Sequence, residues 1–573
     1  VAIACSRACS IRAPVSMASL PLYRLTVRHP VATVNKDCHI GRSDFSDCGW
    51  AGLDARGPRG RAWRACDGDR CRDRGLVSTV LLAARGVEVT LLERAAKPGG
   101  KMREVEVAGQ RIDAGPTVLT MRGVLEEVFA DAGARLADHL SLQPAEVLAR
   151  HAWSAGERLD LYADVARSAD AIGTFAGAAE ARGYLAFCAH ARRVFETLEA
   201  PFIRAERPSL HGLVGGVGVR RLGGLARIRP FTTLWQGLAD HFRDPRLRQL
   251  FGRYATYCGS SPFRAPATLM LVAHVEQAGV WLVDGGMHRI AEALAGLALS
   301  HGAVIRYGVE ARSIEAEHGR VAGVTLADGE RIATDRCIVN ADVAAVAAGR
   351  LGPAAAAAVP ASPAAGRSLS AVTWNLIAPT DGFPLLRHTV FFSRDYAAEF
   401  ESIFGHGRLP TEPTVYVCAQ DRDDRGGARA PGPERLLCLV NAPATGDRHP
   451  FDATEIAACA DRAFGLLERC GLTIRRDPEA MVTTTPASFE RLFPATGGAL
   501  YGAASHGWRA AFARAGTRTR LPGLHLAGGS VHPGPGVPMA ALSGRMAAAS
   551  ILRDLASTSR SRPAATAGGT STR

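Results

Sequence analysis

The sequence of 573 residues has no long uninterrupted apolar run, because Arg, Gly or Pro breaks each apolar stretch within about the length of a strand. A membrane-spanning helix, which needs about 20 consecutive apolar residues, is therefore not expected. Aromatic residues make up only 6% of the chain and do not interleave with basic clusters, which argues against a nucleic-acid-binding protein. Hydrophobic residues (47%) and charged residues (21%) are present in ordinary proportions for a folded protein. The length predicts two closely joined domains.

The sequence also lacks the paired cysteine spacing of a zinc site, so no metal is expected. Seven of its 13 cysteines are scattered singly through apolar surroundings, as is typical of free buried thiols in a reducing, cytoplasmic setting. The other six all lie in the first 74 residues: Cys5, Cys9, Cys38, Cys48, Cys66 and Cys71.

Basic charge is distributed unevenly. Residues 1–74 contain 12 Arg and one Lys against seven Asp and no Glu, a net charge of +6 out of the +13 of the whole chain. The excess over the remaining residues is mild and requires no nucleic-acid partner.

Residues 1–74 also lack sustained apolar periodicity, whereas periodic order begins at Gly75. One interpretation is a targeting extension, because the first acidic residue is Asp37 and such peptides are poor in acids. The other is translation in the wrong reading frame. Shifting the codons of Gly68 to Leu76 by one base permits I-G-A-G-I-G-G-L, a dinucleotide-binding fingerprint, and the same shift over residues 64–67 permits an apolar strand. We therefore hypothesise a lost base near the Arg74 codon.

The segment after Gly75 has the pattern of a nucleotide-binding fold. Residues 75–86 predict a helix that ends at Gly86, and residues 87–92 predict a buried strand that ends in Glu93. A carboxylate at this position can accept hydrogen bonds from both hydroxyls of an adenosine ribose, although any strand can end in Glu.

Two glycine-rich segments, one near each end of the chain, are candidates for contact with a cofactor. Residues 97–101 (KPGGK) place glycines beside cations and could bring backbone amides to a pyrophosphate, or could form a solvated turn. Residues 524–527 predict a strand that leads into a second glycine cluster, Gly528 to Gly536, before an Ala-rich helix.

Taken together, Glu93-Arg94, PGGKMR (98–103), DAGPTVLT (113–120) and HPGPGVP (532–538) resemble the carotenoid and phytoene desaturase family of FAD-dependent oxidoreductases. The resemblance covers about residues 75–555. It implies an α/β fold, with a Rossmann-like FAD-binding domain built from both chain ends and an inserted α+β substrate domain. The FAD contacts that it implies are Gly75, Glu93, Arg94, Gly99, Gly100, Lys101, Gly115, Pro116, Thr117, Ala311, Gly528, Gly529, Gly536, Val537, Pro538 and Met539.

The expected domain organisation follows from the same resemblance. After the anomalous residues 1–74, FAD-binding segments are expected at 75–120, 281–345 and 501–556. A mainly helical substrate or membrane region is expected at 121–280, the sheet and helices of the substrate domain at 346–500, and a disordered tail at 557–573.

The resemblance also implies a function. The substrate would be a long apolar carotenoid in an apolar tunnel, reached from a membrane surface on which the enzyme docks without spanning it. The electron acceptor would be a quinone or oxygen. The form GGSVHPGPGVPMAALSGR (528–545) is similar to that of bacterial hydroxycarotenoid and methoxyneurosporene 3,4-desaturases, which indicates a 1-hydroxy or 1-methoxy neurosporene-type substrate.

Alternatives remain open at this stage. They are phytoene desaturation, another flavoenzyme of the amine oxidase superfamily, and an inactive relic if Arg70 and Arg72 truly stand where the fingerprint has glycine. His532, in the loop expected near the flavin, is a candidate proton acceptor or else a hydrogen-bonded anchor of the loop. Asp113 and Asp284 are expected to cap turns.

Overall fold

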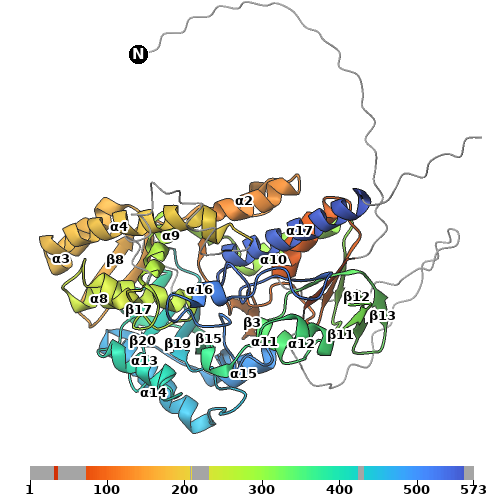
Figure 1. Cartoon of the computed structure of the whole chain (residues 1–573). Coiled ribbons are helices and arrows are strands. Elements are labelled where there is room, and N and C mark those ends of the chain that lie inside the picture. The colour runs from red at the N-terminus through yellow and green to blue at the C-terminus, as the bar shows by residue number, and fades with distance from the viewer. Residues whose placement is uncertain (1–30, 36–72, 207, 209–230, 424–431, 561–573) are drawn as a thin grey trace, which may run out of the picture.

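The computed structural model describes residues 31–35, 73–206, 208, 231–423 and 432–560. Two layered units lie side by side in it (Figure 1). The red first elements and the blue last helix share one unit, whereas the yellow helices and the cyan strands form the other. The predicted fold class, an α/β domain built from both chain ends with an inserted second domain, is confirmed.

The first unit contains a five-stranded parallel sheet. Its order is β10 (Val304–Tyr307), β2 (Val89–Glu93), β1 (Val31–Asn35), β14 (Arg336–Val339) and β22 (Leu524–Leu526). The helix α1 (Asp73–Ala83) packs against both α10 (His288–Ser300) and α17 (Val537–Arg560). These helices and the sheet share one apolar core, in which Val77, Val80 and Leu81 of α1 are buried. The carboxyl ends of parallel strands meet at one edge, where such sheets bind nucleotides.

The central position of this sheet is occupied by β1, which pairs in parallel with β2 and with β14. Sequence reasoning expected no strand before Gly75 in the reading frame as written. Residues 36–72, which separate β1 from α1, lie outside the described residues, as do Arg70 and Arg72. A dinucleotide-binding fold instead joins its first strand to its first helix through a short glycine loop.

Smaller antiparallel elements flank the parallel sheet. The strands β3 (Glu104–Val107) and β4 (Gln110–Asp113) form a hairpin, and β12 (Arg320–Leu326) turns at Asp328–Gly329 into β13 (Arg331–Ala333). The strand β11 (Ala311–Glu317) pairs with β12. Beyond them lie two short helices, α11 (Val343–Ala347) and α12 (Pro353–Ala358).

The second unit is built on a seven-stranded sheet. Its order is β21 (Met481–Thr484), β15 (Ser370–Ala378), β19 (Glu434–Ala442), β18 (Val415–Ala419), β17 (His388–Phe391), β7 (Val147–Ala152) and β8 (Arg158–Tyr162). Side chains alternate between its faces. On β15, Trp374 packs edge-to-face on Phe464 of α14 (Ala453–Arg469), whereas Thr373 faces a cavity. The sheet expected within residues 346–500 is present, and β7 and β8 join it from outside that range.

Helices predominate in residues 121–280, but strands also occur there. The helices are α2 (Arg122–Asp131), α3 (Val165–Ala176), α4 (Ala178–Leu198), α7 (Leu234–Leu238), α8 (Pro245–Gly252) and α9 (Leu271–Gln277). The strands β7 and β8 join the large sheet, and β6 (Leu142–Pro144) pairs with β9 (Val280–Val283), which also pairs with β5 (Leu119–Thr120). The period-two apolar pattern of these strands is short and lies between helical segments, so the sequence pattern of the region as a whole indicated helix.

The remaining elements complete the two units. They are α13 (Tyr396–Phe404), α15 (Pro486–Leu492), α16 (Ala510–Ala513), β16 (Thr380–Gly382) and β20 (Leu472–Ile474). The last helix, α17, continues to Arg560, past Ser557, where a disordered tail was expected to begin. Residues 561–573 lie outside the described residues.

His525, in the middle of β22, makes the stability of the parallel sheet sensitive to acid. Its side chain is 2% exposed, and burial lowers its pKa to about 4. Because the unfolded state binds this proton near pH 6.5 and the folded state does not, stability falls as the pH drops from about 6.5 to about 4, by up to about 3 kcal/mol.

We expect the substitution His525→Gln to reduce this acid sensitivity. The difference in unfolding free energy between pH 7 and pH 4.5, measured by urea denaturation, should be smaller than in the parent chain by about 2 kcal/mol. The exposed His449 provides the control, because His449→Gln should leave the difference unchanged. If the unfolding free energy falls equally between pH 7 and pH 4.5 in His525→Gln and in the parent chain, His525 is not the source of the acid sensitivity.

Candidate functional site

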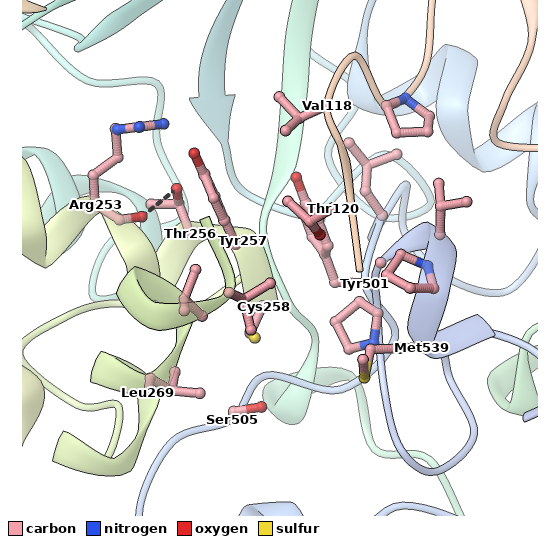
Figure 2. Close-up of a pocket in the computed structure, with 18 of the residues that line it drawn as sticks. Val118, Thr120, Arg253, Thr256, Tyr257, Cys258, Leu269, Tyr501, Ser505 and Met539 are labelled. Atoms are coloured by element: carbon pink, nitrogen blue, oxygen red, sulfur yellow. Dashed lines mark hydrogen bonds between the residues drawn. The ribbon is translucent and has the colours of Figure 1, made fainter. Parts of the chain in front are cut away.

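A cavity of about 660 Å³ lies between the two units. Its walls come from the loop after β4, the start of α17, the inner face of the seven-stranded sheet and the helices of residues 198–275. Figure 2 shows the chain from residues 253–258 on one side and Met539 on the other. The lining is mostly apolar, as a long hydrocarbon substrate requires.

The loop after β4 is held rigidly against the cavity. The buried carboxylate of Asp113 accepts hydrogen bonds from Met287 N (2.7 Å) and His288 N (3.2 Å), and thereby caps α10. Burial raises the pKa of Asp113, and these two backbone donors oppose that rise. From the second unit, Gln420 Nε2 donates to the Asp113 carbonyl oxygen (2.8 Å). The predicted capping role of Asp113 is confirmed.

Gly115, Pro116 and Thr117, which the family resemblance implied as FAD contacts, follow Asp113 and line the cavity. A Cβ atom at Gly115 would overlap the backbone carbonyl oxygen of Lys101. Only glycine therefore allows the loop to pack directly on the glycine turn of residues 97–101.

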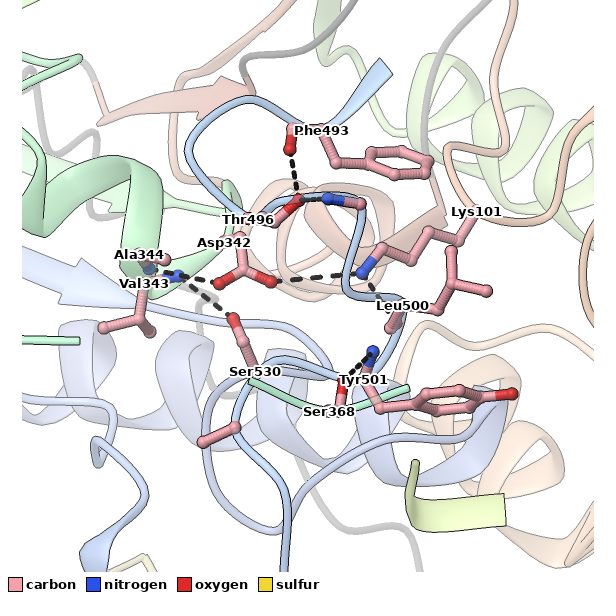
Figure 3. Close-up of polar contacts among 12 residues, drawn as sticks. Lys101, Asp342, Val343, Ala344, Ser368, Phe493, Thr496, Leu500, Tyr501 and Ser530 are labelled. Carbon is pink, nitrogen blue, oxygen red and sulfur yellow. Dashed lines mark hydrogen bonds and ion pairs between the residues drawn. The ribbon is translucent and has the colours of Figure 1, made fainter. Parts of the chain in front are cut away.

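That turn lies beside the second glycine segment at a smaller pocket. Gly99, Gly100 and Lys101 face Gly528 and Gly529 across it. Lys101 Nζ donates to the Leu500 carbonyl oxygen (2.7 Å) and lies 3.9 Å from Asp342 Oδ2, as Figure 3 shows. The two predicted glycine segments thus meet, with a cation between them, in an arrangement that suits a diphosphate.

The chain continues from Gly529 to the cavity. Ser530 Oγ accepts a hydrogen bond from Val343 N (3.1 Å), which fixes the segment next to Asp342 (Figure 3). Gly536, Val537, Pro538 and Met539 then line the large cavity at the first turn of α17. One continuous segment therefore connects the small glycine pocket to the cavity.

Other predicted cofactor residues lie around the carboxyl end of β2. The side chain of Glu93 is fully buried, and its Oε1 accepts a hydrogen bond from Ala95 N (2.6 Å). Val309 N donates to the Glu93 carbonyl oxygen (2.8 Å), which brings the chain that enters β11 at Ala311 against this end. Arg94 follows Glu93 and forms an ion pair with Glu310 at 3.5 Å. Gly75, another predicted cofactor residue, lies in the first turn of α1.

His532 occupies a different environment from the one a proton acceptor needs. Its side chain is 1% exposed, its Nε2 lies 2.9 Å from the Phe202 carbonyl oxygen, and it is not among the residues that line the cavity. Burial lowers its pKa. This position favours the second prediction, an anchor that ties the loop of residues 528–536 to Phe202.

The sequence did not predict a set of polar residues on the cavity wall. Arg253, Tyr257 and Tyr416 line the cavity and come from segments that read as ordinary helix or strand. Their spacing along the chain carries no motif, because the fold alone brings them together. The only available signal was the presence of Arg and Tyr in stretches that were otherwise apolar.

A parallel sheet with glycine segments at its carboxyl edge, continued into an apolar cavity between two units, defines a dinucleotide-dependent oxidoreductase. The family model described as flavin containing amine oxidoreductase matches residues 75–552, and the chain belongs to this family. Within it the chain is a carotenoid desaturase. It is 58% identical to a hydroxyneurosporene desaturase of Rubrivivax gelatinosus over 501 residues, which is 87% of this chain and 95% of the relative.

A second relative supports this assignment, and a solved structure shows the same fold. A hydroxyneurosporene desaturase of Cereibacter sphaeroides is 45% identical over 85% of this chain and 97% of its own length. Among solved structures, putrescine oxidase bound to putrescine aligns with a TM-score of 0.52 and 15% identity over 84% of this chain and 97% of that one. The structural likeness shows the fold alone.

FAD is the cofactor of this family, and the residues present fit it. The small glycine pocket, with Lys101 at its side, can accept a diphosphate, and the cavity walls at Gly115–Thr117 and Gly536–Met539 can enclose a flat ring. The alternative of another flavoenzyme of the amine oxidase superfamily is not favoured, because relatives at 58% and 45% identity are desaturases of carotenoids.

Proposed function

We propose that this protein catalyses the FAD-dependent 3,4-desaturation of a 1-hydroxy or 1-methoxy acyclic carotenoid of the neurosporene type. The observation that carries the proposal is the apolar cavity that adjoins the glycine-rich segments from both chain ends. The names of the two hydroxyneurosporene desaturases supply the substrate class. Phytoene desaturation and an inactive relic are the competing functions.

When bound, FAD supplies a two-electron acceptor for the hydrogen that leaves the substrate. The residues of the chain orient the polyene, exclude water and hold the reacting carbons against the flavin. The Gly115–Thr117 loop and the Gly536–Met539 turn, each fixed by its own contacts, enclose the place for the ring. We assign adenine to the backbone around Ala311 and the ribose to Glu93, because both lie at the carboxyl end of β2.

We further propose that the enzyme docks on a membrane surface, from which a carotenoid can enter the cavity. Among the described residues, no helix is long and apolar enough to cross a membrane. Phe231 is 77% exposed, packs edge-to-face on Trp508 at a ring separation of 5.4 Å, and lines the cavity together with it. An exposed aromatic ring at a cavity wall suits insertion into the interface of a bilayer.

The test offers 1-hydroxyneurosporene, its methoxy analogue and phytoene, each in lipid vesicles, to the flavin-loaded protein. We expect the protein to float with the vesicles on density centrifugation. It should lengthen the conjugated system of the first two substrates by one double bond and leave phytoene unchanged. Conversion of phytoene alone would replace the proposed function by phytoene desaturation, and conversion of none would favour the relic.

A further inference from the structure

Four of the polar residues that line the mostly apolar cavity lie near the expected flavin loop or contact one another. We call them the polar wall: Thr117, Arg253, Tyr257 and Tyr416. Burying polar groups in an apolar cavity is unfavourable unless they are hydrogen-bonded. Their contacts outside the cavity therefore decide what they can offer to a ligand within it.

Tyr257 is fixed from behind by Glu276, which is 5% exposed. The Tyr257 hydroxyl donates to Glu276 Oε1 (2.5 Å), and the Tyr254 hydroxyl donates to Glu276 Oε2 (2.7 Å). Burial raises the pKa of Tyr257, so its hydroxyl stays protonated. A carboxylate accepts only, so Tyr257 uses its proton on Glu276. The Tyr257 oxygen also interacts with the Arg253 guanidinium, and its second lone pair can face a ligand.

Arg253 lies beside Tyr257 and offers donors only. Its guanidinium carbon lies 5.0 Å from the centroid of the Tyr257 ring, and Figure 2 shows the side chain extending toward the hydroxyl end of that ring. Within the described part of the chain, its buried Nε has no hydrogen-bond partner. A buried donor without an acceptor costs free energy, which a ligand oxygen would recover.

Tyr416 joins the polar wall to the loop of the flavin site. Its hydroxyl lies 2.7 Å from Thr117 Oγ1 and 2.8 Å from His388 Nδ1. Burial lowers the pKa of His388 to about 3, so the imidazole is neutral. Because Thr117 follows Gly115 and Pro116, the polar groups begin beside the expected flavin ring.

We propose that the polar wall is the subsite for the oxygen-bearing end of the substrate, an inference that depends on the proposed function. The C1 oxygen of a hydroxylated carotene is attached two carbons from C3, so an enzyme that oxidises the C3–C4 bond must hold this oxygen close to the flavin. A hydroxyl can accept from Arg253 and donate to the Tyr257 oxygen. A methoxy oxygen can only accept.

The polar wall thereby selects against a carotene that lacks the oxygen. Such an end would leave the Arg253 Nε donor without an acceptor, and sites built to hydrogen-bond a hydroxyl reject analogues without it. The hydroxylated substrate should depend on both residues, and the methoxy substrate mainly on Arg253.

The experiment compares kcat/KM for 1-hydroxyneurosporene and for neurosporene in the flavin-loaded protein and in Tyr257→Phe. We expect the preference for the hydroxylated substrate to fall about tenfold in Tyr257→Phe, chiefly through KM, which corresponds to about 1.4 kcal/mol. The preference for the methoxy analogue over neurosporene should fall less. Binding, measured as quenching of tryptophan fluorescence by the polyene, should weaken in parallel.

Tyr184→Phe is the matched control, because it removes a buried tyrosine hydroxyl that does not line the cavity, and it should leave the preference unchanged. An unchanged preference in Tyr257→Phe, or an equal loss for both substrates, would overturn the inference and leave the desaturase function standing. If the parent protein binds FAD but converts no substrate, the proposed function fails instead.

Discussion

Restoring the glycine loop before α1 is expected to tighten FAD binding by about 100-fold or more. The restored chain carries Asp69→Ile, Arg70→Gly, Cys71→Ala, Arg72→Gly, Asp73→Ile and Arg74→Gly. In this fingerprint the glycines let the backbone approach the pyrophosphate, so that helix amides can donate to it, whereas Arg side chains would occupy that space. Two or three lost charge-assisted hydrogen bonds account for about 3 kcal/mol. Titration of flavin fluorescence measures the change.

The arrangement of the parallel sheet supports this expectation. Its central position is occupied by Val31–Asn35, and residues 36–72 intervene before α1. In the shifted frame an apolar strand would lead directly into the glycines, as the fold requires. We therefore propose that the DNA lacks a base near the Arg74 codon.

One control separates the effect of the loop from general effects on stability: reintroducing arginine at positions 70 and 72 of the restored chain should again abolish tight FAD binding. The reading-frame hypothesis is tested separately, because DNA sequencing over the codons for Arg64 to Leu76 should reveal the missing base. Equally tight FAD binding by the chain as written and by the restored chain would show that the glycine loop is not needed here.

Substituting Gly115 by alanine is expected to reduce desaturation at least about 100-fold. The added Cβ would overlap the Lys101 carbonyl oxygen, so the loop would have to move away from the glycine turn. A displacement of about 1 Å at a site that positions reactants can cost this much activity, and overpacking of this kind typically costs about 1–3 kcal/mol of stability. Steady-state desaturation and urea unfolding measure the two effects.

The control is Gly123→Ala, in the first turn of α2, where a Cβ meets no atom within 4 Å. This variant should retain full activity and stability. Near-normal activity in Gly115→Ala would mean that the loop does not fix the flavin.

The sequence predicted the nucleotide-binding unit well because its signals are local. The glycine segments at 99–100 and 528–529 are short motifs, and the structure brings them to one pocket as expected. The hairpin turn at Asp328–Gly329 also follows from residue chemistry that acts over a few positions. By contrast, the hairpin of β7 and β8 gains its place in the large sheet only because β7 pairs with β17, which lies far along the chain.

The substrate side of the site could not be predicted for a similar reason. Arg253, Tyr257 and Tyr416 come from different elements, and only the folded chain places them on one wall. An apolar residue that lines a cavity is also indistinguishable in sequence from one in a core. On β19, Leu437 and Leu439 line the cavity, whereas Leu436 and Val440 are buried behind it.

The most direct test is a single-turnover experiment without oxygen. Flavin-loaded protein is mixed with 1-hydroxyneurosporene in vesicles, and the absorbance of the flavin and of the carotenoid is recorded together. We predict that the absorbance of oxidised flavin disappears in step with a red shift of the carotenoid by one double bond, in equal amounts, with the new bond between C3 and C4. If the flavin stays oxidised and the carotenoid is recovered unchanged from fully loaded protein, the protein is not the desaturase described here.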